Sequence, residues 1–210
     1  MNNMGYEHFV SKEDLDHEAF ASPNYLGVED LAMIPPSEAW LSKIPKDERV
    51  FMTYLTLMSH HDYEVPEGWD KSWGGDKELD AYHSAVHYLD KVVEEVFAML
   101  ERQGRRDDAL ILIVGDHGEA FGEHGRYLHD DALYQEGIHI PLALSGPGLS
   151  PRRAPWPVSQ LDILPTLVHH AGFAFTSGSY PGQRLDIAPK EDETRRIFSF
   201  CWYQNRCGAV

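Results

Sequence analysis

The chain has few basic residues, only two cysteines and no long hydrophobic run. Lys and Arg number 18 against 34 Asp and Glu, so the net charge is −16 over 210 residues. This balance argues against a nucleic-acid partner, because phosphate backbones are bound by basic surfaces. No run of about 18 apolar residues occurs, so we predict no membrane span. Cys201 and Cys207 could form a small disulfide loop or remain two thiols, and the sequence does not decide between these alternatives.

Several catalytic signatures are also absent. The chain has no Gly-x-Ser-x-Gly nucleophile elbow, no Gly-x4-Gly-Lys-Ser/Thr phosphate loop, no dinucleotide fingerprint after its first expected strand, and no His-Glu-x-x-His. These absences leave a metal-dependent hydrolase as the class to test against the residues. The first eight residues are polar and lack the apolar core of a secretory signal, so the compartment is unknown.

The hydrophobic pattern predicts an α/β fold, with a mostly parallel sheet flanked by helices on both faces. The strand, helix, strand order in the first half of the chain is typical of parallel sheets. Residues 1–49 are polar and interrupted by prolines, so we expect loops and short helices that belong to the same domain as residues 50–210. The expected strands are 50–57, 109–114, 138–144 and 196–202, and the expected helices are 79–103 and 159–172.

Residues 116–131 carry three histidines and five carboxylates, and they follow the apolar strand 109–114. Asp116 and His117 begin this segment. Asp supplies a hard oxygen and His a borderline nitrogen to a divalent cation, and nearby glycines let the backbone bend toward the ion. A solvated acidic loop is the alternative. A position at the carboxyl end of a strand, where ligands of open α/β sheets gather, favours the metal site.

A second polar cluster, His60 and His61, follows the expected strand 50–57. A parallel sheet would bring the ends of both strands to the same edge. The two clusters would then face a shared pocket able to hold a metal ion and a tetrahedral anion.

An ordered series of segments resembles the sulfatase branch of the alkaline phosphatase superfamily. The resemblance covers residues 50 to about 185. The segments are Thr-Leu-Met-Ser-His-His-Asp-Tyr at 56–63, the helix pattern Tyr-x3-Val-x-Tyr-x-Asp at 82–90, Gly-Asp-His-Gly-Glu at 115–119, Tyr-Gln-Glu-Gly-Ile-His-Ile-Pro at 134–141, and Gln-Leu-Asp-Ile-Leu-Pro-Thr at 160–166.

This resemblance implies a metal-dependent sulfuric ester hydrolase that acts on a sulfate or phosphate ester. It implies one divalent metal ion, either Ca²⁺, Mn²⁺ or Zn²⁺, bound by Asp116 and His117. His60 would contact the oxygens of the anion, and His129 would be a second anion contact or a second metal ligand. Family members are mostly exported or membrane-anchored.

Other polar residues of the same segments have plainer interpretations. His61 and His124 could simply be exposed, and Glu119 could support a ligand or be solvated. We expect Tyr134 and Asp162 to stabilise loops and helix starts, and we expect structural roles for His169 and His170.

The sequence departs from the family in one important respect. Family members carry their nucleophile and further acidic metal ligands before the first strand seen here, and no Cys/Ser-x-Pro-x-Arg motif occurs in this chain. We therefore expect residues 50–210 to be the C-terminal part of a catalytic domain, with the missing N-terminal half as partner and no activity alone. The alternatives are a phosphoethanolamine- or phosphoglycerol-type phosphotransferase, which the loop 122–129 favours, and a non-catalytic binding remnant.

Overall fold

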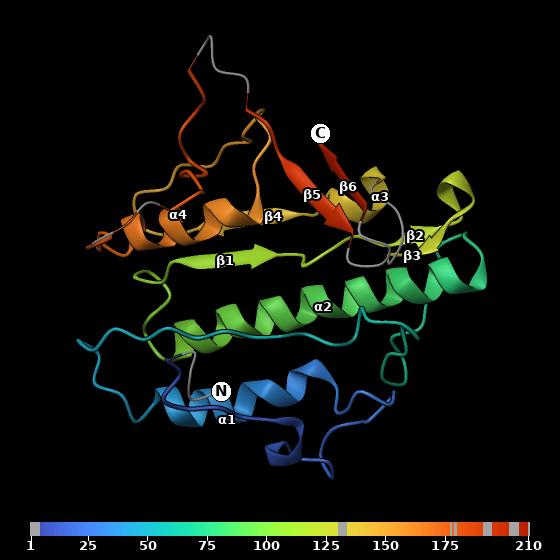
Figure 1. Ribbon diagram of the computed structural model, residues 1–210. Coiled ribbons are helices and arrows are strands. Elements are labelled where there is room, and N and C mark those ends of the chain that lie inside the picture. Colours follow the sequence, from blue (N-terminus) through green and yellow to red (C-terminus); the bar gives the residue numbers. More distant parts are fainter. Residues whose placement is uncertain are drawn as a thin grey trace. The chain divides into compact units, whose positions relative to one another are not determined.

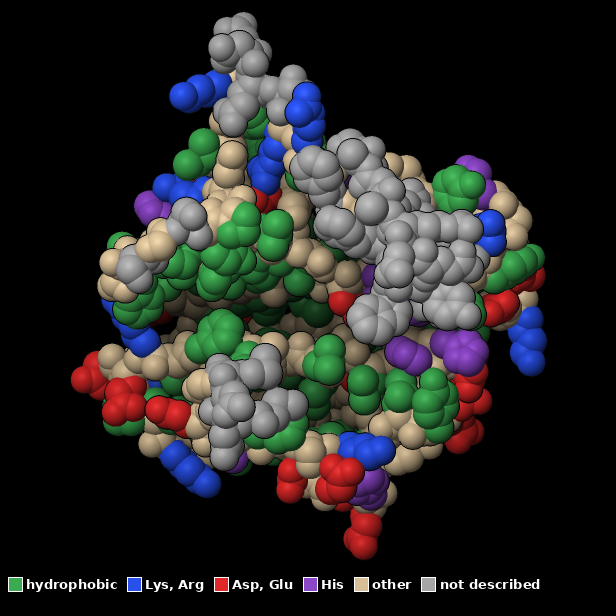
Figure 2. Space-filling view, viewed as in Figure 1, with side chains coloured by type: hydrophobic (Ala, Val, Ile, Leu, Met, Phe, Trp, Pro, Cys, Tyr) green, Lys and Arg blue, Asp and Glu red, His purple; other side chains and the backbone are tan. Residues whose placement is uncertain are grey.

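The computed structural model describes residues 5–129, 134–176, 178, 180–190, 195–201 and 206–209. The chain forms two compact units, Met1–Asp107 and Asp108–Val210, and each is described by itself. The predicted division of the sequence, in which residues 1–49 belong to the same domain as residues 50–210, stays a prediction. On the face that Figure 2 shows, apolar side chains form contiguous patches and acidic side chains lie mainly in separate groups.

The first unit is built on one long helix, α2 (Lys77–Arg102), drawn in green in Figure 1. Asp76 caps its start by accepting a hydrogen bond from the Leu79 N–H at 2.9 Å. Gly104, in a left-handed conformation, closes its end. The fully buried residues of the helix lie along one stripe and comprise Ser84, Ala85, Tyr88, Val92, Met99 and Leu100.

Short helices precede α2 in this unit. They are η2 (Lys12–Asp14), η3 (Asp30–Met33) and α1 (Ile34–Leu41). Glu38 of α1 accepts two hydrogen bonds from the Arg102 guanidinium, at 3.0 and 2.8 Å, and so ties α1 to the end of α2. The hydroxyl of Tyr88 donates to Glu29, just before η3. Burial and this contact raise the pKa of Tyr88.

The expected strand 50–57 is not a paired strand. Residues 51–57 have no strand assignment and run beside α2 in cyan in Figure 1. The sequence correctly indicates a segment rich in β-branched and aromatic residues. A strand, however, also needs a neighbour for its backbone N–H and C=O groups. Within the described part of the chain, no such neighbour is present.

The second unit contains three two-stranded sheets, and each described pair is antiparallel. The predicted, mostly parallel sheet is therefore not confirmed. β1 (Ile111–Val114) pairs with β4 (Leu142–Ser145), with Ile111 opposite Ser145 and Val114 opposite Leu142. The physical reason lies in the connection. A parallel partner is usually reached through a crossover helix. The connection 115–141 is long enough for a crossover, but its described residues form only a short hairpin and two single-turn helices.

The strand expected at 138–144 begins later than predicted. Its first residue, Ile138, is instead the last residue of α3 (Gln135–Ile138), and β4 starts directly after Pro141. Proline has no N–H to donate to a ladder, so the start of a strand is one of the positions that it tolerates.

The other strands of this unit are short. β2 (Ala120–Phe121) and β3 (Tyr127–Leu128) form a hairpin around the single turn η4 (Glu123–Gly125). β5 (Phe198–Cys201) replaces the expected strand 196–202 and pairs with β6 (Arg206–Ala209). The side chains of Cys201 and Cys207 lie outside the described part, so the two alternatives for them stand as before.

The Asp-x-x-Pro-Thr segment anchors the last helix of the second unit. η5 (Gln160–Asp162) leads directly into α4 (Ile163–His170). The buried carboxylate of Asp162 accepts hydrogen bonds from the N–H of Ser159 at 2.7 Å and of Gln183 at 2.8 Å, and it pairs with Arg195. Asp162 therefore stabilises a helix start, as expected. No described helix is long and apolar enough to cross a membrane.

Asp30 gives the first unit a testable pH dependence. Its carboxylate is 1% exposed and accepts hydrogen bonds from the N–H groups of Leu57 at 2.8 Å and Met58 at 3.1 Å. Burial outweighs these bonds and raises the pKa of Asp30 from 3.8 to about 6. The unfolded chain therefore loses this proton at lower pH than the folded chain. Stability from Asp30 should be complete below pH 4 and decline as the pH rises to 6.

We predict that Asp30→Asn removes this decline. The difference in the free energy of unfolding between wild type and variant should change by up to about 3 kcal/mol across that window, at about 1.4 kcal/mol per pKa unit. Urea unfolding between pH 4 and 7 measures it, with the exposed Asp47→Asn as a control. Parallel pH profiles for wild type and Asp30→Asn would contradict the assignment.

Candidate metal and anion site

Gly115, the first residue after β1, is held in place by hydrogen bonds to its backbone N–H and C=O groups. The Gly115 N–H donates to the Pro141 carbonyl at 3.1 Å and extends the β1–β4 pairing by one step. The side-chain amide of Gln160 donates to the carbonyls of Gly115 at 3.2 Å and Asp116 at 2.8 Å. The Asp116 side chain is 81% exposed, so its carboxylate is accessible from solvent.

His117 has a defined tautomer in this arrangement. Its Nδ1 lies 2.9 Å from the Gly118 carbonyl, which can only accept a hydrogen bond. Nδ1 therefore carries a proton, and in the neutral ring Nε2 is the nitrogen left to bind an ion. That Nε2 lies 3.6 Å from the Asp116 carboxylate. A backbone carbonyl that holds one ring nitrogen of a histidine while the other is left for an ion is a common feature of metal sites.

His129 lies beside His117 because of the β2–β3 hairpin. Ala120 pairs with Leu128, so the next residues outward, Glu119 and His129, are direct neighbours across the hairpin. The largely buried Glu119 carboxylate accepts a hydrogen bond from the His129 Nδ1 at 3.2 Å. The rings of His129 and His117 stack with their centroids 3.9 Å apart. The structure thus brings together Asp116, His117 and His129, and it gives Glu119 a supporting position.

His124 has a partner of its own in the same unit. It donates from Nδ1 to Glu136 at 2.8 Å and stacks on Tyr134 with a centroid distance of 4.0 Å. The hydrogen bond from His124 lowers the pKa of Glu136. His124 and Tyr134 therefore connect the hairpin turn to α3, which gives Tyr134 the loop-stabilising role expected from the sequence.

His60 lies in the first unit and the other three predicted site residues lie in the second. Its ring is exposed, with Nδ1 donating to the His61 carbonyl at 2.7 Å and the edge of Tyr25 facing it at 6.3 Å. His61 pairs with Asp62 at 3.1 Å. The shared pocket of His60 with Asp116 and His117 stays a prediction.

His170 has the structural role expected from the sequence. His170 on α4 contacts the Asp186 carboxylate at 3.2 Å, and Arg184 lowers the pKa of Asp186 to about 2. Two residues that sequence reasoning did not single out are Gln160 and Glu136. Both stood inside segments that were recognised, but their partners are distant in the sequence.

The Asp116 carboxylate and the His117 Nε2 are far enough apart, and close enough, to contact one divalent ion. Two ligand atoms about 2.1 Å from one tetrahedral ion lie about 3.4 Å apart, and the Asp116 and His117 atoms are separated by 3.6 Å. In the described part of the chain, no group of three or more His, Cys, Asp or Glu side chains is close enough to hold a metal. The spacing of these two atoms is therefore compatible with a shared divalent ion, and the metal site stays a prediction.

Comparison with solved structures gives the fold class. The chain resembles a protein in the alkaline phosphatase superfamily from Vibrio parahaemolyticus, with a TM-score of 0.74 and 22% identity over 98% of this chain and 47% of that one. This supports an α/β fold. The Sulfatase family model matches residues 1–173, and the chain belongs to the sulfatase family.

Curated relatives include both sulfatases and synthases. Choline-sulfatase of Rhizobium meliloti (strain 1021) is 37% identical over 45% of this chain and 18% of its own length. Lipoteichoic acid synthase 1 of Bacillus subtilis (strain 168) is 26% identical over 93% of this chain and 32% of its own length. The chain thus spans a third or less of the length of these two relatives. Members of this superfamily generally use a divalent metal ion.

We predict that Gly118→Ala disrupts the site by steric overlap. A Cβ at Gly118 would lie 1.9 Å from the carbonyl oxygen of Glu136, so α3 would have to move. The free energy of unfolding should fall by about 1–3 kcal/mol, the usual cost of inserting atoms into a packed region.

Gly115→Ala is the matched control for this substitution, because the nearest atoms to its added Cβ lie at 3.4 Å. Urea unfolding of both variants provides the comparison. Equal losses of stability for the two variants would show that α3 does not pack against Gly118 as described.

Proposed function

We propose that the chain is part of a metal-dependent sulfuric ester hydrolase. In this proposal Asp116 and His117 bind one divalent ion, and His60 and His129 contact the oxygens of the sulfate group. The observation that carries the proposal is the orientation of His117. Its protonated Nδ1 is held by the Gly118 carbonyl, and its Nε2 lies 3.6 Å from the Asp116 carboxylate.

Charge supports a cation at this position. With a net charge of −16 the protein repels an anionic ester at long range, so an anion site must be made attractive locally. When bound, a divalent ion would neutralise an oxygen of the ester and lower the pKa of a nucleophile. The Asp116 carboxylate would balance part of the charge of that ion.

His129 would contribute through its position beside His117. Glu119 holds the His129 ring through Nδ1, which fixes the ring orientation. An imidazole fixed in this way can stabilise charge on the transferred group or protonate the leaving alcohol. In this proposal His60, which follows residues 51–57, contacts the same anion as His129, as the family resemblance implies.

A phosphotransferase is the second candidate. One observation favours it: the match to a lipoteichoic acid synthase covers 93% of this chain, whereas the match to choline-sulfatase covers 45%. The same ligand pair and the same histidines would serve transfer of a phosphoryl-type group. The two candidates differ in the atom attacked, sulfur or phosphorus, and in the acceptor.

Metal binding by the isolated chain tests the shared part of both candidates. We expect calorimetry with Mn²⁺, Zn²⁺ or Ca²⁺ to show one site, and Asp116→Asn and His117→Gln to weaken it by more than about tenfold, since loss of an outer partner alone costs that much. Asp108→Asn, a change at another exposed aspartate, is the control. Unchanged affinity in Asp116→Asn, with its thermal stability retained, would contradict the proposal.

Turnover distinguishes the two candidates. Aryl sulfate and aryl phosphate esters are offered to the metal-loaded protein, supplied with the rest of the domain where the chain alone is inactive. We expect faster hydrolysis of the sulfate ester, and loss of that activity in Asp116→Asn. Preference for the phosphate ester would favour the phosphotransferase. Metal binding without turnover of either ester, even with the domain completed, would support a binding protein instead.

A further inference from the structure

The backbone bends at Asp116, the second residue after β1. In an extended strand, neighbouring side chains point to opposite faces, so an adjacent Asp and His would face apart. At the bend, the Asp116 Oδ1 accepts a hydrogen bond from the His117 N–H at 2.9 Å, and Oδ2 lies 3.6 Å from the His117 Nε2. The approach of the two candidate ligands therefore depends on this bend.

One side-chain nitrogen contacts both carbonyls at the bend. The Gln160 Nε2 donates to the carbonyls of Gly115 at 3.2 Å and Asp116 at 2.8 Å. An amide nitrogen carries two hydrogens, one for each carbonyl. Successive carbonyls of an extended strand point in opposite directions, so a single nitrogen reaches both only where the chain turns between them. The Gln160 amide is therefore complementary to the bent backbone and not to a continued strand.

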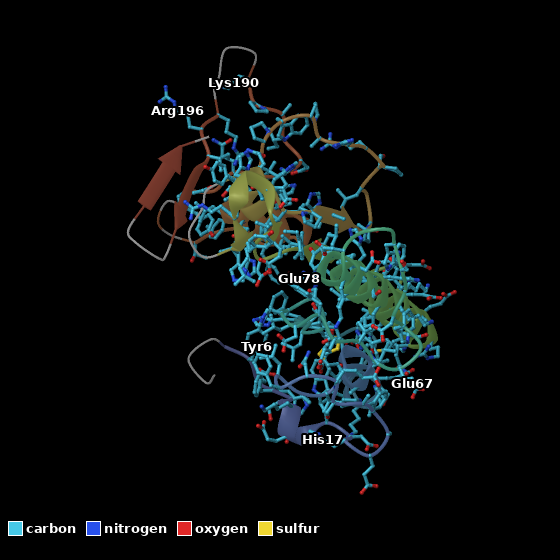
Figure 3. The ribbon with its side chains drawn as sticks, turned by 90° about the vertical axis from the view of Figure 1, so that its right-hand side faces the viewer. Tyr6, His17, Glu67, Glu78, Lys190 and Arg196 are labelled. Carbon is cyan, nitrogen blue, oxygen red and sulfur yellow. The ribbon has the colours of Figure 1, made fainter. Side chains whose placement is uncertain are left out.

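The turn that carries Gln160, η5, is anchored by buried groups of the same unit. Asp162, 1% exposed, accepts a hydrogen bond from the Gln183 N–H at 2.8 Å and pairs with Arg195, whose side chain is 11% exposed. The next residue, Arg196, is exposed and points away from the ribbon in Figure 3. Because η5 is held in this way, the side chain of Gln160 starts from a fixed backbone position.

We propose that Gln160 is a positioning residue for Asp116 and His117 as ligands of one divalent ion. It acts through the backbone and contacts neither the ion nor the ester. Without its amide, the carbonyls of Gly115 and Asp116 would be hydrated, and the segment would also populate extended conformations in which the two ligands face apart. The ion would then have to order the segment on binding, which lowers affinity. This inference rests on the proposed function, because it concerns the same ion.

A positioning role and a purely structural role of Gln160 differ in what they change. Gln160 is exposed, and water replaces the hydrogen bonds of an exposed amide, so loss of the amide should cost little stability. Metal affinity depends instead on how often the unloaded chain already holds both ligand atoms together. Loss of the Gln160 amide should therefore lower the affinity for the ion much more than the stability of the fold.

Metal titration of Gln160→Met tests the proposal, because this substitution removes the amide and nearly keeps the length of the side chain. We expect the affinity for Mn²⁺, measured by calorimetry, to fall by about tenfold, as loss of an outer partner of a ligand does. Gln135→Met, at an exposed glutamine of α3, is the matched control and should bind Mn²⁺ as the wild type does. In the Asp116→Asn background, Gln160→Met should have little further effect, since both changes act through one ligand.

Hydrogen–deuterium exchange of the metal-free chain reports on the bend itself. The His117 N–H is bonded to the Asp116 carboxylate at the bend, so its exchange shows how often the bend opens. We expect the His117 amide to exchange faster in Gln160→Met than in the wild type and in Gln135→Met. Unchanged exchange of this amide in Gln160→Met would overturn the inference without any metal present.

The metal titrations separate failure of this inference from failure of the proposed function. Weaker Mn²⁺ binding by Asp116→Asn, together with wild-type binding by Gln160→Met, would overturn the positioning role and leave the proposed function standing. An equal loss of affinity from Gln160→Met with and without Asp116→Asn would also overturn it, because Gln160 would then not act through Asp116. Equal Mn²⁺ affinity of the wild type and Asp116→Asn would overturn the proposed function, and the positioning role with it.

Discussion

The hydrogen bonds around Gly115 determine where the Asp-His pair of this sulfatase-family chain lies. The β1–β4 pairing continues through the Gly115 N–H, and the Gln160 amide then holds the next two carbonyls from η5. With its backbone fixed on both sides, Asp116 turns its carboxylate to solvent, and the following Gly118 carbonyl orients His117. The start of α4 also affects the site, because Asp162 stabilises the turn η5, which carries Gln160.

Helices and strands that are determined by residues within or next to their own segment could be predicted from the sequence. The helix expected at 79–103 is observed as Lys77–Arg102, because its apolar spacing, its N-cap and its closing glycine all lie within the segment itself. The strand expected at 109–114 is observed as Ile111–Val114. Pairing partners could not be predicted in this way. The antiparallel β1–β4 pair and the unpaired segment 51–57 depend on residues far away in the chain.

The residues of the candidate site also separate into those with a local sequence signal and those without one. Asp116 and His117 could be selected from their residue types and their place after a strand, and His129 was implied by the resemblance to the sulfatase family. The Glu119–His129 contact follows from the hairpin register, and that register depends on a turn built from Gly122, His124 and Gly125 in left-handed conformations. The Gln160 contact joins positions 44 and 45 residues apart and leaves no local signal. Sequence reasoning therefore found the donors but not the residues that orient them.

The site proposal depends on Asp116 and His117 acting together as ligands of one ion. An NMR titration with Mn²⁺ tests this directly, because a paramagnetic ion broadens the signals of nearby nuclei first. We expect substoichiometric Mn²⁺ to broaden the signals of the His117 imidazole and the backbone amides of 116–118, and then those of the stacked His129 ring. The exposed acidic surface elsewhere should be unaffected at that ratio. Broadening spread evenly over the acidic surface, with the His117 signals still sharp, would contradict the claim.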